Sequence, residues 1–263
     1  MTRLQSELRR LYLPQASSGQ DTAADAASLV DDGGRVRAMV LELARPADWA
    51  ALSTVWAGVQ TDLALPAPAI AVSGKDGYQL WFSLAQPLPA AQATAFLDAL
   101  RVRYLGDIRP QRIGLWPRLD AAALQPTPLS TPPSTPPTLH ASLVPAVQAG
   151  TGLWSAFIAP DLAAAFADEP WLDLPPNRDG QCNLLARLKS ISADDLAVAL
   201  GRLQPAAVLA PAQPAAAAGP QAGPGLDPKR FLLDIMNNPG VALGLRIEAA
   251  KALLPYTHAP QRL

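Results

Sequence analysis

Apolar residues in the first 119 positions follow two periodicities, one typical of strands and one typical of helices. Dense apolar runs bounded by Pro, Gly or Asp predict strands, and they cover 35–43, 68–73, 78–84 and 111–117. Apolar residues spaced three and four apart predict helices, and they cover 2–12, 45–60 and 89–105. The turn Gly74-Lys75-Asp76-Gly77 separates the second strand from the third, because glycine accepts a positive φ.

After the N-terminal helix, the elements follow the order β-α-β-β-α-β. This order predicts an α+β domain over residues 1–119, ferredoxin-like or RRM-like, with an antiparallel sheet and both helices on one face. The other face needs a cover. The candidates are the N-terminal helix, through Leu4, Leu8, Leu11 and Tyr12, and a pair of helices at the C-terminus. A covered face would favour a scaffolding role over base stacking.

The rest of the chain alternates between low-complexity and helical segments. Residues 120–139 are rich in Pro and 204–225 in Ala and Pro, so both are expected to be linkers. Between them, 140–203 predicts a helical module, in which Ser192 caps a helix and Asp195 completes a capping-box-like pair. Residues 226–258 predict a helical pair, broken at Asn237-Asn238-Pro239-Gly240.

The composition of the chain excludes several kinds of site and partner. The 263 residues are 49% apolar and 16% charged with a net charge of −1, so no global basic charge recruits nucleic acid. One cysteine, Cys182, excludes an intramolecular disulfide, and with two histidines it excludes an ordinary zinc site. No run reaches the roughly 20 apolar residues of a membrane span. We therefore expect a cytoplasmic protein with no membrane association and no cofactor.

The predicted sheet has two common uses that need different side chains. Exposed aromatic residues on the central strands stack on bases in RNA-binding domains, whereas carboxylates on the first strand hold divalent metals in nucleotidyl transfer. The candidates for stacking are Tyr78 and Phe82 on the third strand, and Arg109 and Arg112 flank the last strand. The alternative is that Tyr78, Trp81 and Phe82 simply belong to the core.

"SGKDGYQLWFSLAQPL" and "YLGDIRPQRIGLWP" together resemble the archaeo-eukaryotic primase-polymerase superfamily. Plasmid and phage replication members of that superfamily carry a Ser-Gly-x-Gly-x-His-x-Trp strand pair, followed by an Asp-x-x-x-x-x-Arg-x-Pro segment. The residues that match the first motif here are Ser73, Gly74, Gly77 and Trp81, and those that match the second loosely are Asp107, Arg112 and Pro117. The resemblance covers residues 1–119.

This chain departs from the superfamily at its catalytic positions. The pair of acidic residues on the first strand is reduced to Glu42, and Gln79 stands where the superfamily has a nucleotide-binding His. One carboxylate is too few to fix two divalent ions. The resemblance therefore implies a degenerate primase-like domain without polymerisation. Metal-dependent nucleotidyl transfer, with Glu42 and Asp107 as ligands, stays an alternative, and only this alternative needs a divalent metal.

The C-terminal "FLLDIMNNPGVALGLRIEAAKALLPYTH" resembles a helical segment of bacteriophage proteins, including terminase small subunits. Arg246 and Lys251 on its second helix face DNA phosphates in one interpretation and solvent in the other.

Both resemblances indicate a mobile element, so we expect a non-catalytic, nucleic-acid-associated protein of a phage or plasmid. The expected contacts with DNA are Ser73, Lys75, Tyr78, Gln79, Arg109, Arg112, Arg246 and Lys251. The alternatives are an assembly adaptor that binds proteins through the C-terminal helices, and a weak nucleotidyltransferase.

Overall fold

The structure is a computed structural model that describes residues 2–14, 28–119, 138–203 and residue 250. The chain divides into two units, Met1–Ala207 and Val208–Leu263. The predicted linker at 204–225 and the helical pair at 226–258, with Arg246 and Lys251, lie outside the described residues, apart from residue 250. The account below therefore concerns the first unit.

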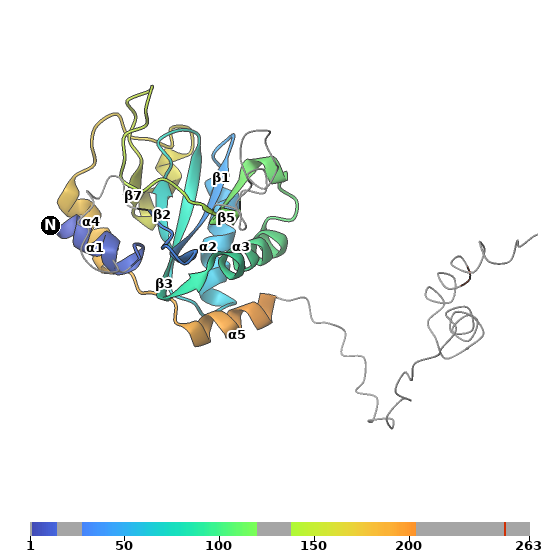
Figure 1. Ribbon diagram of the computed structural model, residues 1–263. Helices are drawn as coiled ribbons and strands as arrows, with labels where there is room; N and C mark the ends of the chain where they lie inside the picture. Colours follow the sequence, from blue (N-terminus) through green and yellow to red (C-terminus); the bar gives the residue numbers. More distant parts are fainter. Residues whose placement is uncertain (1, 15–27, 120–137, 204–249, 251–263) are drawn as a thin grey trace, which may run out of the picture. The chain divides into compact units, whose positions relative to one another are not determined.

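The first unit is an α+β structure built on a five-stranded antiparallel sheet with the order β4-β1-β3-β2-β7 (Figure 1). Its strands are β1 (Arg35–Ala44), β2 (Ala69–Val72), β3 (Gly77–Pro89), β4 (Ile113–Trp116) and β7 (Ala156–Ile158). The first four are the strands that the apolar runs predict. The fifth comes from the region that the sequence assigns to a separate helical module, and it pairs with β2.

One face of the sheet packs against three helices. They are α2 (Trp49–Thr61), α3 (Ala90–Tyr104) and α5 (Ala193–Leu203), and their apolar residues share one core with the sheet. Helix α2 begins later than predicted: Asp48 is its N-cap and accepts a hydrogen bond from the Ala51 N–H at 3.0 Å, so Pro46 lies outside the helix. Ser192 Oγ accepts a hydrogen bond from the Asp195 N–H at 3.1 Å, which confirms the predicted N-cap of α5.

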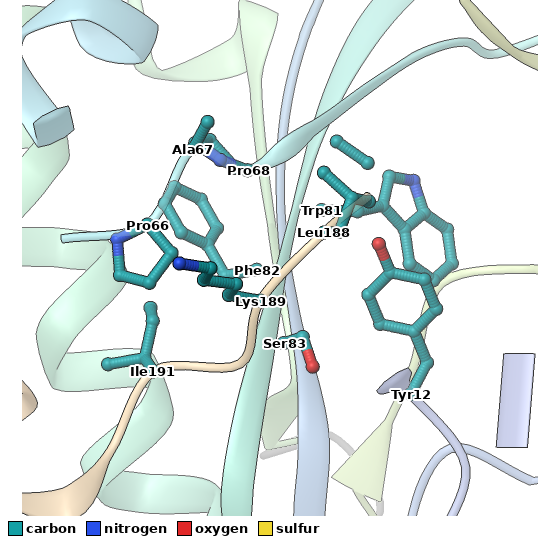
Figure 2. A pocket seen from close by; sticks show the side chains of 11 residues that line it. Tyr12, Pro66, Ala67, Pro68, Trp81, Phe82, Ser83, Leu188, Lys189 and Ile191 are labelled. Carbon is teal, nitrogen blue, oxygen red and sulfur yellow. The ribbon is translucent and has the colours of Figure 1, made fainter. Parts of the chain in front are cut away.

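The opposite face is covered by α1 (Arg3–Leu11) and α4 (Arg178–Ala186), which also pack against each other (Figure 1). The N-terminal helix is thus one of the covers that this face was expected to need. Figure 2 shows Trp81 and Phe82 on opposite sides of β3, with Tyr12 beside Trp81. The two rings of Tyr12 and Trp81 meet edge to face at 5.2 Å, and Phe157 of β7 lies against both.

Arg37 fastens α1 to the sheet. The pairing register of β1 with β3 shifts between Val36 and Ala38, so Arg37 and Ala38 both face α1. The buried guanidinium of Arg37 donates hydrogen bonds to carbonyls at the end of α1 and on β3; the acceptors are Arg9, Arg10, Leu13 and Leu84. A positive charge at the C-terminus of a helix also complements its dipole.

Residues 140–203 differ from the predicted helical module because their apolar residues complete the sheet and its two layers. Within the predicted helical module, residues 160–166 form a 3-10 helix, η4 (Pro160–Phe166), and not an α-helix. The predicted linker at 120–139 ends in a short pairing between β5 (Arg118–Leu119) and β6 (Thr138–Leu139). None of the described helices has the length and apolar character needed to cross a bilayer.

Candidate functional site

The candidate site is a pocket of about 570 Å³ on the α1 side of the sheet, at the end where α1 does not reach. Its floor comes from β1, β3 and β4, and its walls come from the turn before β3, the η2 helix (Pro110–Arg112) and the segment 140–155. The polar side chains that line it are Glu42, Arg45, Ser73, Lys75, Asp76, Gln79, Gln111, Arg112, Arg118, His140, Ser142, Gln148 and Ser155.

A chain of hydrogen bonds crosses the pocket floor. Glu42 and Gln79 are directly paired across β1 and β3, and Gln79 Nε2 donates to Glu42 Oε1 at 3.2 Å. The indole Nε1 of Trp81 donates to Gln79 Oε1 at 2.9 Å. Because an indole can only donate, this contact fixes the amide orientation of Gln79 and directs its NH₂ to Glu42. Gln79 therefore links the aromatic core to the carboxyl group.

Gly114 leaves room for the Trp116 ring and the carboxyl group of Glu42 to lie close to it. Glu42 pairs with Gly114 on β4, and a Cβ there would lie 2.3 Å from the Trp116 ring and 3.2 Å from Glu42 Oε2. Burial is the main cause that raises the pKa of Glu42; the hydrogen bond from Gln79 opposes it and the charge of Asp76 adds to it. The floor thus favours a neutral carboxyl more than water does.

The turn between β2 and β3 is held by Ser73. Its Oγ accepts hydrogen bonds from three backbone N–H groups, those of Lys75, Asp76 and Gly77, at 3.0 to 3.2 Å. Gly74 has φ +75°, and a Cβ there would lie 2.7 Å from the backbone nitrogen of Ser155. Ser73 and Gly74, two of the residues that match the primase motif, therefore shape the pocket wall and present Lys75 at its rim.

Basic side chains outnumber acidic ones around the pocket. Arg45, Lys75, Arg112 and Arg118 line it, against Glu42 and Asp76. Arg112 is held in place: it donates to the carbonyls of Ala44 and Pro46, at 3.3 and 2.9 Å, and its Nη2 lies 3.6 Å from Asp48 Oδ2. Lys75 and Arg118 are exposed at the rim. The lining therefore suits an anionic ligand.

The structure separates the sequence candidates into two groups. Ser73, Lys75, Gln79, Arg112 and Glu42 meet in this pocket. The other candidates in the described residues, Tyr78, Phe82, Arg109 and Asp107, do not line it.

The two aromatic candidates for base stacking belong to the core. Tyr78 and Phe82 are buried on the face that carries α2 and α3. The Tyr78 hydroxyl donates to the carbonyl of Ala163 at 2.6 Å, and burial raises the pKa of Tyr78 to about 12. Neither ring is open to a base, so the core alternative holds. Arg109 and Asp107 are exposed in the turn after α3.

Sequence reasoning missed several residues of the pocket. Arg45 directly follows β1, which carries Glu42, and Arg118 lies two residues after the end of β4, which pairs with β1, so strand order could have found both. The sequence motif indicates only a turn at Asp76, but Asp76 lines the pocket and its charge contributes to the raised pKa of Glu42, whereas Asp107 does not line the pocket. His140, Gln148 and Ser155 enter from a region with no sequence signal for this site.

Within the described ranges, no group of three or more His, Cys, Asp or Glu side chains could hold a metal ion. A comparison of the chain with models of known protein families and with curated proteins finds no match. The primase-like identity therefore stays a prediction that rests on the quoted motifs.

Proposed function

We propose that this protein associates with nucleic acid and holds a phosphate-bearing strand in the pocket over Glu42 and Gln79, without polymerising nucleotides. The observation that carries the proposal is that four basic side chains line the pocket, against two acidic ones. Phosphate contacts supply most of the affinity in sequence-independent binding. Lys75 and Arg118 at the rim contact the backbone, and the immobilised Arg112 orients it.

The fold proposal is that β1 to β4, with α2 and α3, form a ferredoxin-like, degenerate primase-like domain to which β7 is added. The order β4-β1-β3-β2 and the placement of both helices on one face support it. In this interpretation Glu42 and Gln79 occupy the positions of the superfamily's acidic residues and His. A phage or plasmid origin belongs to the same proposal and rests on the sequence resemblance.

The pocket changes the metal ligands that the nucleotidyltransferase alternative would use. Its metal ligands would be Glu42 and Asp76, because both line the pocket and Asp107 does not. Incorporation of a labelled nucleotide with Mg²⁺ or Mn²⁺ that is lost in Asp76→Asn, but kept in Asp107→Asn, would favour this alternative over the proposal.

Binding to DNA tests the proposal directly. Fluorescence anisotropy of labelled single-stranded and duplex DNA, titrated with the full chain across a salt series, should show affinity that falls linearly with log salt. Lys75→Gln and Arg118→Gln should each weaken binding and reduce the single-strand salt slope by about 0.7. Arg187→Gln, an exposed arginine outside the pocket, should change neither.

Two outcomes would contradict the proposal. One is no change in anisotropy at low salt up to about 100 μM protein, the weak end of non-specific binding. The other is binding that survives Lys75→Gln and Arg118→Gln but is lost in Arg246→Gln/Lys251→Gln, which would place the contact outside the pocket.

A further inference from the structure

A second surface of the same unit has the opposite character. A groove of about 680 Å³ lies beside β7, between η4 and α4. The large apolar side chains of its lining include Phe157, Leu162, Phe166, Leu172, Leu174 and Leu184. Leu162 is 53% exposed and Leu174 is 76% exposed. The proposed nucleic-acid pocket and this groove share no lining residue.

The exposure of two leucines in one groove needs an explanation. Single exposed apolar residues are common on protein surfaces, whereas apolar side chains gathered in one concave surface mark interaction sites. The other large exposed hydrophobic residues in the described ranges are Val102, Leu139, Val147 and Val198, and none of them lines the groove. Leu162 and Leu174 are therefore the exposed part of a larger apolar surface.

The sheet edge beside the groove is closed to another strand. Phe157 directs its N–H and C=O away from β2, and the side-chain amide of Gln181 occupies both. Gln181 Oε1 accepts from the Phe157 N–H, and Gln181 Nε2 donates to the Phe157 carbonyl, each at 2.8 Å. An incoming segment therefore finds no free edge groups here, and it must bind through side chains, as a helix in a groove does.

The charge around the groove selects its occupant. The segment 159–184, which supplies the lining, carries five acidic residues against one basic residue, Arg178. The acidic residues are Asp161, Asp168, Glu169, Asp173 and Asp179, all exposed. Asp173 lines the groove itself, and Asp161 and Asp179 are the chain neighbours of lining residues. This charge repels phosphate and favours an occupant with Lys or Arg beside its apolar side chains.

We propose that the groove binds an amphipathic helical segment of a partner protein, with apolar residues on one face and Lys or Arg flanking them. Leu162 and Leu174 close over its apolar side chains, and Asp173 pairs with a basic residue at its border. The protein then has two separate surfaces, one for an anionic strand and one for a basic helix.

Selection from a displayed library tests this proposal. Random peptides of about 15 residues, about four helical turns, are selected on the full chain and counter-selected on Leu162→Ser/Leu174→Ser. Both substituted side chains are exposed, so the variant should keep the fold, which circular dichroism checks. The expected winners combine apolar residues three and four apart with Lys or Arg. No enrichment over the counter-selection, or enrichment of acidic peptides, would overturn the proposal.

Affinity measurements with the best labelled peptide then separate apolar from charge contacts. Leu162→Ser/Leu174→Ser should weaken binding at least about tenfold, and Asp173→Asn about threefold with a smaller salt dependence. The matched controls, Val102→Ser and the exposed Asp32→Asn, should leave the affinity unchanged. Equal losses in the controls would show non-specific attraction and overturn the proposal.

Light scattering of the full chain tests the competing occupant. A monomer at micromolar concentration is expected. A dimer that dissociates in Leu162→Ser/Leu174→Ser would assign the groove to a second copy of this chain instead. The DNA titration does not use these residues, so the failure of either proposal leaves the other standing.

Discussion

Single residues carry out structural and site-forming roles at once in this protein. Gln79 is the clearest case, because its amide accepts from Trp81 in the core and donates to Glu42 in the pocket. Similarly, the Ser73 hydroxyl accepts the backbone hydrogen bonds that hold the turn in the pocket wall. A motif match at such positions reports geometry as much as chemistry, so it does not by itself indicate catalysis.

The raised pKa of Glu42 makes stability depend on pH. Because the folded-state pKa lies above its ordinary value of 4.5, the neutral carboxyl stabilises the fold below that pH, and this contribution is lost as pH rises through the folded-state pKa. Glu42→Gln keeps an acceptor for Gln79 and cannot ionise. We expect it to stabilise the fold near pH 7 and to make little difference near pH 4.

Urea unfolding of both proteins at several pH values measures this difference. The exposed Glu169→Gln serves as the control and should follow the original protein at each pH. A Glu42→Gln variant that is less stable at pH 7 would show that the charged carboxylate, and not the neutral acid, is the form that the pocket prefers.

At the scale of elements, the two faces of the sheet are covered by different means. Helices α2, α3 and α5 bury continuous apolar faces, so the hydrophobic effect holds them. Helix α1 adds a polar attachment, in which Arg37 binds the carbonyls at its C-terminus and Arg10 donates to the Leu185 and Leu188 carbonyls at the end of α4. Pairing α1 with α4 over this face leaves the Glu42 end uncovered.

Arg37→Met should loosen α1. The substitution keeps the length of the side chain but leaves buried carbonyls without their charged donor, which costs about 2–4 kcal/mol. Arg35→Met is the control on the same strand, since the exposed Arg35 donates a single bond, to the Pro87 carbonyl. Chemical denaturation gives the stability, and cleavage by trypsin after Arg9 or Arg10 reports the release of α1. Equal stability in both variants would contradict the role given to Arg37.

At the scale of the whole molecule, the predicted boundary at residue 119 cuts through a shared core. β7 pairs with β2, and Phe157 and Leu185 pack in the cluster that contains Tyr12 and Trp81. Helix α5 adds Leu196 and Leu203 to the other core. Residues 1–119 and 138–203 are therefore parts of one folded unit, and the groove beside β7 is attached rigidly to the sheet that forms the pocket.

A chain that ends at residue 119 should lose cooperative unfolding. It exposes Trp81 and the edge of β2, so we expect it to bind a dye specific for apolar surface and to melt without a sharp transition. A chain that ends at Ala207, the boundary of the first unit, is the control and should unfold cooperatively. Sharp, matching transitions in both, measured by calorimetry, would restore the prediction of an independent domain at 1–119.

The sequence by itself determined the local elements and their order. Periodicity located β1 to β4, α1, α2 and α3, because alternating and helical spacing are set by neighbours along the chain. Capping chemistry placed the start of α5 at Ser192. Motif reasoning also named Ser73, Lys75 and Gln79 as DNA contacts and Glu42 as a weak metal ligand, and all four line the pocket.

Only the tertiary structure decided which surfaces are buried and which residues meet. Tyr78 and Trp81 look alike in the sequence, yet one faces α2 and the other faces α1, and both are buried because separate segments cover each face. The 156–158 strand is too short to have a period, and pairing with β2 alone makes it a strand. The pocket and the groove arise from contacts between residues far apart in the chain, which local propensity does not encode.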